Sequence, residues 1–115
     1  MSRDRRPEPF RHERVERALL EELRSLIAAE VRDPALEGAW AVDVQLSPDG
    51  KNAKVSYAVR SKGAEAAVAR MTKDAFSRAA GFLRSRVALS LDLKRTPQLS
   101  FVFIGLLPQE EQATV

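Results

Sequence analysis

The stretch Ser77-Arg-Ala-Ala-Gly-Phe-Leu-Arg84 places a glycine in the middle of an otherwise regular helical pattern. Apolar residues recur every three or four positions on both sides of that glycine, at Val68, Met71, Ala75 and Phe76 and then at Phe82, Leu83, Val87 and Leu91. A glycine inside a helix costs about 1 kcal/mol relative to alanine. The pattern therefore predicts a kink at Gly81 that divides the segment into two helices and lets another backbone come close.

Basic residues surround the predicted kink. They are Arg70, Lys73, Arg78, Arg84, Arg86, Lys94 and Arg95, and only Asp74 and Asp92 oppose them in that segment. The formal net charge of the whole chain is only +3, so the positive charge is concentrated here. Localised positive charge attracts phosphates without regard to sequence. A helix C-cap followed by a second core helix, with the arginines on an ordinary solvated face, fits the spacing equally well.

The rest of the chain predicts the element order α-β-β-α-kink-α-β. The elements are a helix at residues 10–31 ended by Asp33-Pro34, strands at 40–46 and 53–59 joined by the Ser47-Pro-Asp-Gly50 turn, the kinked helix pair at 64–91, and a last strand at 99–104. Helices covering one face of a three-stranded sheet make this an α+β fold. The partner of the last strand cannot be read from the pattern.

Alternation predicts which strand residues face the core. The first strand should bury Trp40, Val42, Val44 and Leu46, and the second should bury Ala53, Val55, Tyr57 and Val59. The last strand is apolar on consecutive residues from Phe101 to Ile104, which predicts that both of its faces are covered or nearly so.

Length and composition describe one soluble domain. The chain has 115 residues, of which 44% are hydrophobic and 30% charged, and it contains no cysteine. Its first residues are basic but lack the apolar core of a secretory signal. No apolar run approaches the length of about 20 residues that a helix needs to span a bilayer. We expect a cytoplasmic protein that binds no membrane.

Catalytic chemistry has almost no candidates in this sequence. The single histidine, His12, lies among charged residues that would not orient it as a general base. The serines lack a nucleophile elbow, and no phosphate-binding glycine loop is present. We therefore expect a non-enzyme with no cofactor, no metal and no small-molecule substrate.

Several segments, taken in order, resemble the bacterial ribosome-binding factor A (RbfA) family. They are Arg14-Val-Glu-Arg17, Val31-Arg-Asp-Pro-Ala-Leu36, Val44-Gln-Leu-Ser-Pro-Asp49, Ala53-Lys-Val55, Arg78-Ala-Ala-Gly-Phe-Leu-Arg84 and Arg95-Thr-Pro-Gln-Leu-Ser-Phe101. The resemblance implies a single KH-like domain of type II at residues 10–104, flanked by a flexible basic arm at 1–9 and a flexible tail at 105–115.

The resemblance also implies a function. It points to a monomer that binds the free 30S subunit and its 16S rRNA, assists 5′-end processing and late subunit assembly, and often has a role in cold adaptation. In this family an Ala-x-Gly kink, matched here by Ala79-Ala80-Gly81, replaces the Gly-x-x-Gly loop of other KH domains. Members often carry a longer charged tail than this chain.

The expected RNA-binding residues are Lys73, Arg78, Ala79, Ala80, Gly81, Arg84, Arg86, Lys94 and Arg95. The cations would hold the rRNA backbone, and the glycine would permit close approach. Phe76 and Phe82 fit the core stripe, so base stacking is not expected. Two alternatives remain open: a general KH-like RNA chaperone, and a protein–protein adaptor whose binding would depend little on salt.

Overall fold

The computed structural model describes the backbone of residues 7–108 and the side chains of residues 12–108. The elements are α1 (Pro7–Ala29), the short 3-10 helix η2 (Pro34–Leu36), β1 (Ala39–Leu46), β2 (Asn52–Arg60), α2 (Glu65–Ser90) and β3 (Gln98–Leu107). Helix α1 begins three residues earlier than expected. Strand β3 ends three residues later, so residues 105–107 belong to the sheet and not to a tail. Residues 1–6 of the expected arm and 109–115 of the expected tail lie outside the described residues.

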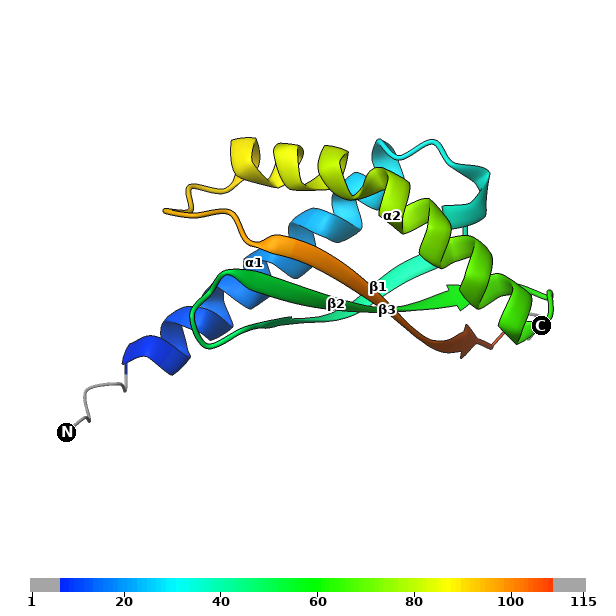
Figure 1. Cartoon of the computed structure of the whole chain (residues 1–115), viewed down its shortest axis with the longest axis horizontal. Helices are drawn as coiled ribbons and strands as arrows, with labels where there is room; N and C mark the ends of the chain where they lie inside the picture. The colour runs from blue at the N-terminus through cyan, green and yellow to red at the C-terminus, as the bar shows by residue number, and fades with distance from the viewer. Residues whose placement is uncertain (1–6, 109–115) are drawn as a thin grey trace, which may run out of the picture.

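The three strands form one mixed sheet in the order β1-β2-β3. Strands β1 and β2 are antiparallel, as the turn predicted, and β3 pairs parallel to β2. The connection through α2 is the long crossover that two parallel neighbouring strands need. Both helices cover the same face of the sheet (Figure 1), which confirms the α+β architecture expected from the sequence.

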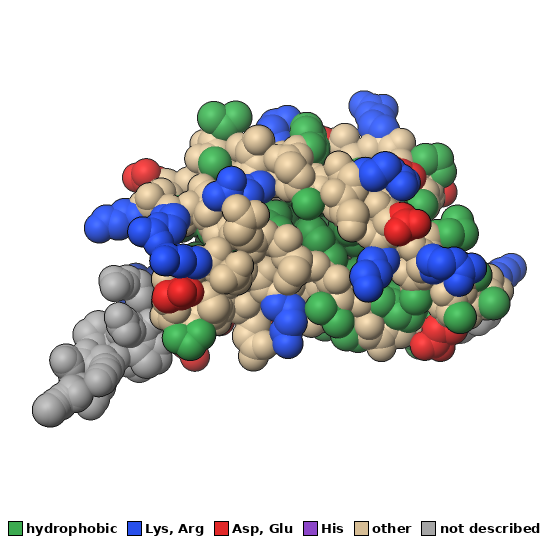
Figure 2. Space-filling model, viewed as in Figure 1, with side chains coloured by type: hydrophobic (Ala, Val, Ile, Leu, Met, Phe, Trp, Pro, Cys, Tyr) green, Lys and Arg blue, Asp and Glu red, His purple; other side chains and the backbone are tan. Residues whose placement is uncertain are grey.

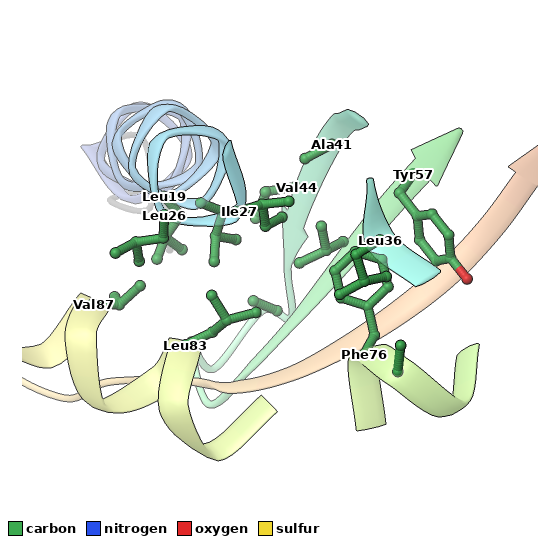
Figure 3. Packing of buried hydrophobic residues seen from close by; sticks show 14 of the residues in the cluster. Leu19, Leu26, Ile27, Leu36, Ala41, Val44, Tyr57, Phe76, Leu83 and Val87 are labelled. Carbon is green, nitrogen blue, oxygen red and sulfur yellow. The ribbon is translucent and has the colours of Figure 1, made fainter. Parts of the chain in front are cut away.

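The core lies between this face of the sheet and the two helices. Leu19, Leu26 and Ile27 of α1 point toward Leu83 and Val87 of α2 (Figure 3). The expected inward residues of β2 are all buried. The apolar stripes of both helices therefore meet in a single hydrophobic cluster.

Aromatic rings tie α2 to the sheet. Phe76 meets the ring of Tyr57 edge-on with centroids 4.6 Å apart and stacks on Phe101 at 4.4 Å. The Thr72 hydroxyl donates its one proton to the Val68 carbonyl at 2.8 Å, so the Tyr57 hydroxyl donates to Thr72 Oγ1 at 2.7 Å. Burial raises the pKa of Tyr57, and the bond to Thr72 offsets part of that rise.

The predicted facing of β1 is wrong in its first half. A β-bulge between Ala41 and Asp43 leaves Val42 without a partner on β2, so the side that faces the core changes there. Ala41 is buried, whereas Trp40 is 46% exposed and is covered on one side by the Arg24 guanidinium, 4.2 Å from its ring centroid. Val44 is buried and Leu46 is half-buried, as expected.

The expectation that β3 is covered on both faces is also wrong. Phe101 and Phe103 face the core, while Val102 and Ile104 are 40% and 54% exposed. A second register shift occurs beside Ile104, followed by Gly105 with a φ of +142°, which only glycine adopts readily. Strand β3 lies at the edge of the sheet, and within residues 7–108 no element covers its outer face.

The expected division of α2 into two helices at Gly81 is not found. α2 is one helix from Glu65 to Ser90, although its ribbon bends near the middle (Figure 1). Phe76, Leu83 and Val87 are buried on both sides of the glycine, and their packing offsets the about 1 kcal/mol helix penalty of glycine.

Candidate nucleic-acid interface

The predicted cations of α2 lie on two opposite sides of the helix. Arg78 and Arg86 reach toward the end of α1, where they contact Asp33 and Glu30. Arg84 reaches the other way, toward the loop at residues 91–97 between α2 and β3. Lys73 lies about three turns before Arg84 and so shares its side of the helix. The structure therefore divides the single basic site expected from the sequence into two.

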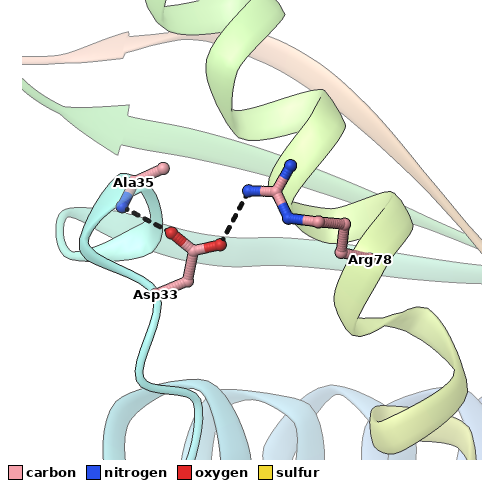
Figure 4. Close-up of polar contacts among 3 residues, drawn as sticks. All are labelled: Asp33, Ala35 and Arg78. Carbon is pink, nitrogen blue, oxygen red and sulfur yellow. Dashed lines mark hydrogen bonds and ion pairs between the residues drawn. The ribbon is translucent and has the colours of Figure 1, made fainter.

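Arg78 is held by an exposed ion pair. Its Nη2 lies 3.0 Å from Asp33 Oδ2, while Asp33 Oδ1 accepts the Ala35 backbone N–H at 3.0 Å (Figure 4). Both hydrogen bonds lower the pKa of Asp33, and the one from the Ala35 backbone has the larger effect. The Arg78 side chain remains 64% exposed, so its other N–H groups stay open to a partner.

Arg86 forms a bidentate pair with Glu30, in which Nη1 bonds Oε1 and Nη2 lies 3.2 Å from Oε2. Its guanidinium also lies 5.7 Å from the ring centroid of Phe82. Arg86 thus ties α2 to the end of α1, and its charge is opposed by a carboxylate. A phosphate would have to compete with Glu30 for this guanidinium.

Arg84 has a structural partner that the sequence did not indicate. Its Nε donates to the Pro97 carbonyl at 3.1 Å and its Nη2 to the Thr96 carbonyl at 2.8 Å. The half-buried guanidinium therefore braces the loop that carries Lys94 and Arg95. Arg84 acts first as a positioning residue for those two cations.

Replacing Arg84 with Ala should loosen this loop. Hydrogen bonds from a charged donor contribute about 1.5–3 kcal/mol when buried, and this group is partly exposed, so we expect a loss of about 1–2 kcal/mol in the free energy of unfolding. Urea denaturation measures that loss, and amide exchange should quicken at residues 92–96. Lys73→Ala is the matched control and should cost little. Unchanged exchange in the loop would contradict the bracing role.

Lys73, Lys94 and Arg95 are exposed, and within the described part of the chain they make no hydrogen bond or ion pair. Lys94 and Arg95 line a hollow of about 540 Å³ with His12, Asp49 and Gly50, which brings the loop, the β-hairpin turn and the start of α1 together. Figure 2 shows basic side chains outnumbering acidic ones on the face that presents α2 and β3. We call Lys73, Lys94 and Arg95 the open flank.

The Ala79-Ala80-Gly81 segment separates the two sides of α2. Both alanines are half-buried, whereas Gly81 is exposed, and a Cβ built on it would meet nothing within 4 Å. No other part of the described chain uses the space beside Gly81. That space is open to a partner from outside.

The exposed cations of α2 and of the loop after it can bind phosphate groups. Among the described residues, no group of His, Asp and Glu could hold a metal ion. None of the helices in the same part of the chain is long and apolar enough to cross a membrane.

The sequence analysis did not identify Arg32, which lines a groove together with Arg78, and it did not predict that Phe82 is exposed. The pattern could not reveal either, because both depend on how α1 ends against α2.

Fold and surface together define a small KH-like α+β domain with exposed cations on both sides of its long second helix. Comparison with known proteins then names its relatives. A family model described as "Ribosome-binding factor A" matches residues 11–108, nearly the whole described chain. The chain belongs to the ribosome-binding factor A family.

Individual relatives agree with this assignment. Ribosome-binding factor A of Ruthia magnifica is 36% identical over 94 residues, covering 82% of this chain and 80% of its own. The crystal structure of ribosome-binding factor A from Thermus thermophilus superposes with a TM-score of 0.69 at 27% identity, covering 80% of this chain and 93% of that one. A model of the Thermus thermophilus protein fitted into a cryo-EM map of a 30S–RbfA complex superposes with a TM-score of 0.55 at 27% identity. The match covers 90% of this chain and 94% of that one.

Proposed function

We propose that this protein binds the free small ribosomal subunit through 16S rRNA and acts there as a maturation factor. The family is named for binding the ribosome, and the Thermus thermophilus relative was fitted into a map of a 30S–RbfA complex, which supports the small subunit as the partner. The observation that carries the proposal is the open flank, because three cations without partners beside a helix are available to phosphates.

The binding is positional and needs no reaction. Lys73 on α2 and the two loop cations hold the rRNA backbone, while Arg84 keeps the loop in place. Gly81 gives the backbone of the RNA room to approach α2. Bound in this way as a monomer in the cytoplasm, the protein assists 5′-end processing and late assembly of the subunit.

Co-sedimentation tests this function. The purified protein is mixed with immature small subunits, mature small subunits, assembled ribosomes and naked 16S rRNA at two salt concentrations. We expect association with free small subunits, most with immature ones, that weakens as salt rises. Equal binding to any RNA would favour a general RNA chaperone, and salt-independent binding would favour a protein adaptor.

Replacing Gly81 with Ala should separate folding from binding. The helix should gain about 0.5–1 kcal/mol in stability, because alanine is the better helix former and its Cβ meets nothing here. Binding to the small subunit should nevertheless weaken, because the added methyl group occupies the space of close approach. Thermal unfolding and co-sedimentation measure the two effects.

Ser77→Ala is the matched control for Gly81→Ala, because Ser77 is exposed one turn earlier on the same helix. It should raise stability slightly and leave binding unchanged. If Gly81→Ala binds small subunits as the natural chain does, the close-approach role of Gly81 is wrong.

A further inference from the structure

A groove lies on the side of α2 that faces away from the open flank. It runs between α2 and the connection from α1 to η2, and its volume is about 430 Å³. Val31, Ala75 and Ala79 supply apolar lining, and Phe82 lines it from the next turn of α2. The space is within the range of small-ligand sites and is open to solvent on the outside.

Phe82 is the unusual residue of this groove. The sequence pattern placed it in the core, but its side chain is 42% exposed, while the neighbouring Leu83 is fully buried. The Arg86 guanidinium lies 5.7 Å from its ring centroid and is itself held by Glu30. The exposed Phe82 ring, beside a guanidinium that Glu30 holds in place, offers a surface on which a planar group such as a nucleobase can stack.

The rim of the groove carries both signs of charge: Arg32 and Arg78 line it together with Glu30 and Asp33. Glu30 is paired with Arg86 and Asp33 with Arg78, which leaves Arg32 as the lining charge that no carboxylate opposes within the described residues. Arg78 is 64% exposed and is oriented by Asp33, as Figure 4 shows. Arg32 also lines the groove, is exposed and has no ion pair or hydrogen bond within the described residues. These two arginines lie where a phosphate attached to a ligand in the groove would be met.

We propose that this groove binds one unpaired nucleotide of RNA, with its base stacked on Phe82 and its phosphate held by Arg32 and Arg78. The inference rests on the proposed function, since it supplies a second RNA contact on the other side of α2. Arg32 favours this occupant over an apolar protein segment, because such a segment would cover an arginine that has no carboxylate partner within the described residues. Unpaired bases commonly stack on aromatic rings and guanidinium planes when proteins read RNA.

The test compares three variants at one position, Phe82→Leu, Phe82→Tyr and Phe82→Ala. The probe is a fluorescent single-stranded RNA of mixed sequence, about ten nucleotides long and thus within the site sizes of single-strand binders, with the same RNA in duplex form as competitor. Phe82 is partly exposed, so all three variants should fold, as circular dichroism will show. Binding to small subunits is measured in parallel by co-sedimentation.

Stacking predicts that Tyr keeps the affinity for single-stranded RNA, whereas Leu and Ala each lose about 5- to 100-fold. Single-stranded RNA should also bind better than the duplex, whose bases cannot enter the groove. Retained RNA affinity in Phe82→Leu with loss in Phe82→Ala would show that an apolar side chain suffices and that the base does not stack on a ring, which would overturn the proposal. Equal affinity in all four proteins would also overturn it, and normal small-subunit binding in that case would leave the proposed function standing.

Discussion

Reversing the charge of the open flank with Lys73→Glu, Lys94→Glu and Arg95→Glu in one chain should nearly abolish association with small ribosomal subunits. We expect a loss of about 100-fold or more in affinity, because phosphate contacts are removed and repulsion replaces them. The fold should be unaffected, since all three side chains are exposed and make no hydrogen bond or ion pair within residues 12–108. Co-sedimentation across a salt series measures the affinity and its dependence on salt.

The control carries Arg17→Glu, Lys54→Glu and Lys62→Glu, three exposed positions on α1, β2 and the following loop. It changes the net charge by the same amount but leaves the open flank intact. Long-range attraction alone would weaken both triple variants equally. Similar losses in the two proteins would therefore refute a localised phosphate site.

Truncating Phe76 to Ala should destabilise the protein more than any surface change. Phe76 is 1% exposed, and its ring joins Tyr57 of β2 to Phe101 of β3. Removing a buried ring of this kind costs about 3–5 kcal/mol, because its contacts are lost and a cavity remains. Domains of this size have about 5–15 kcal/mol of stability in total, so the variant should be marginally folded at 37 °C. Urea denaturation measures the change.

Phe82→Ala is the matched control, because it makes the same chemical change six residues later on the same helix. Phe82 is 42% exposed, so its loss should cost well under half as much. A larger cost for Phe82→Ala than for Phe76→Ala would mean that the ring cluster does not hold α2 to the sheet.

Local patterns were sufficient to predict the hairpin, the order of strands and helical segments and the one-sided α+β packing, but they wrongly divided α2 at Gly81. The stripes of α1 and α2 and the alternation of β2 are strong because the core takes mainly one side of each element, so periodicity follows burial. The exceptions are Met71 and Phe82 of α2, which are exposed, and Ala58 of β2, which is buried between the inward residues Tyr57 and Val59. The same logic failed for Trp40 and Val42, where one extra residue in a bulge reverses the facing of the strand. It also failed for β3, whose consecutive apolar residues include two that face outward at the sheet edge.

The sequence by itself determined that this is a one-domain α+β protein with a basic second helix, because composition and periodicity are properties of short segments. Only the tertiary structure decided which cations are available for binding. Arg78, Arg84 and Arg86 look alike in the chain, yet they meet Asp33, the loop carbonyls and Glu30, which lie 12 to 56 positions away. Such distant partners come together only when α1, α2 and β3 pack, so the difference between a bracing arginine and an open one is a property of the fold.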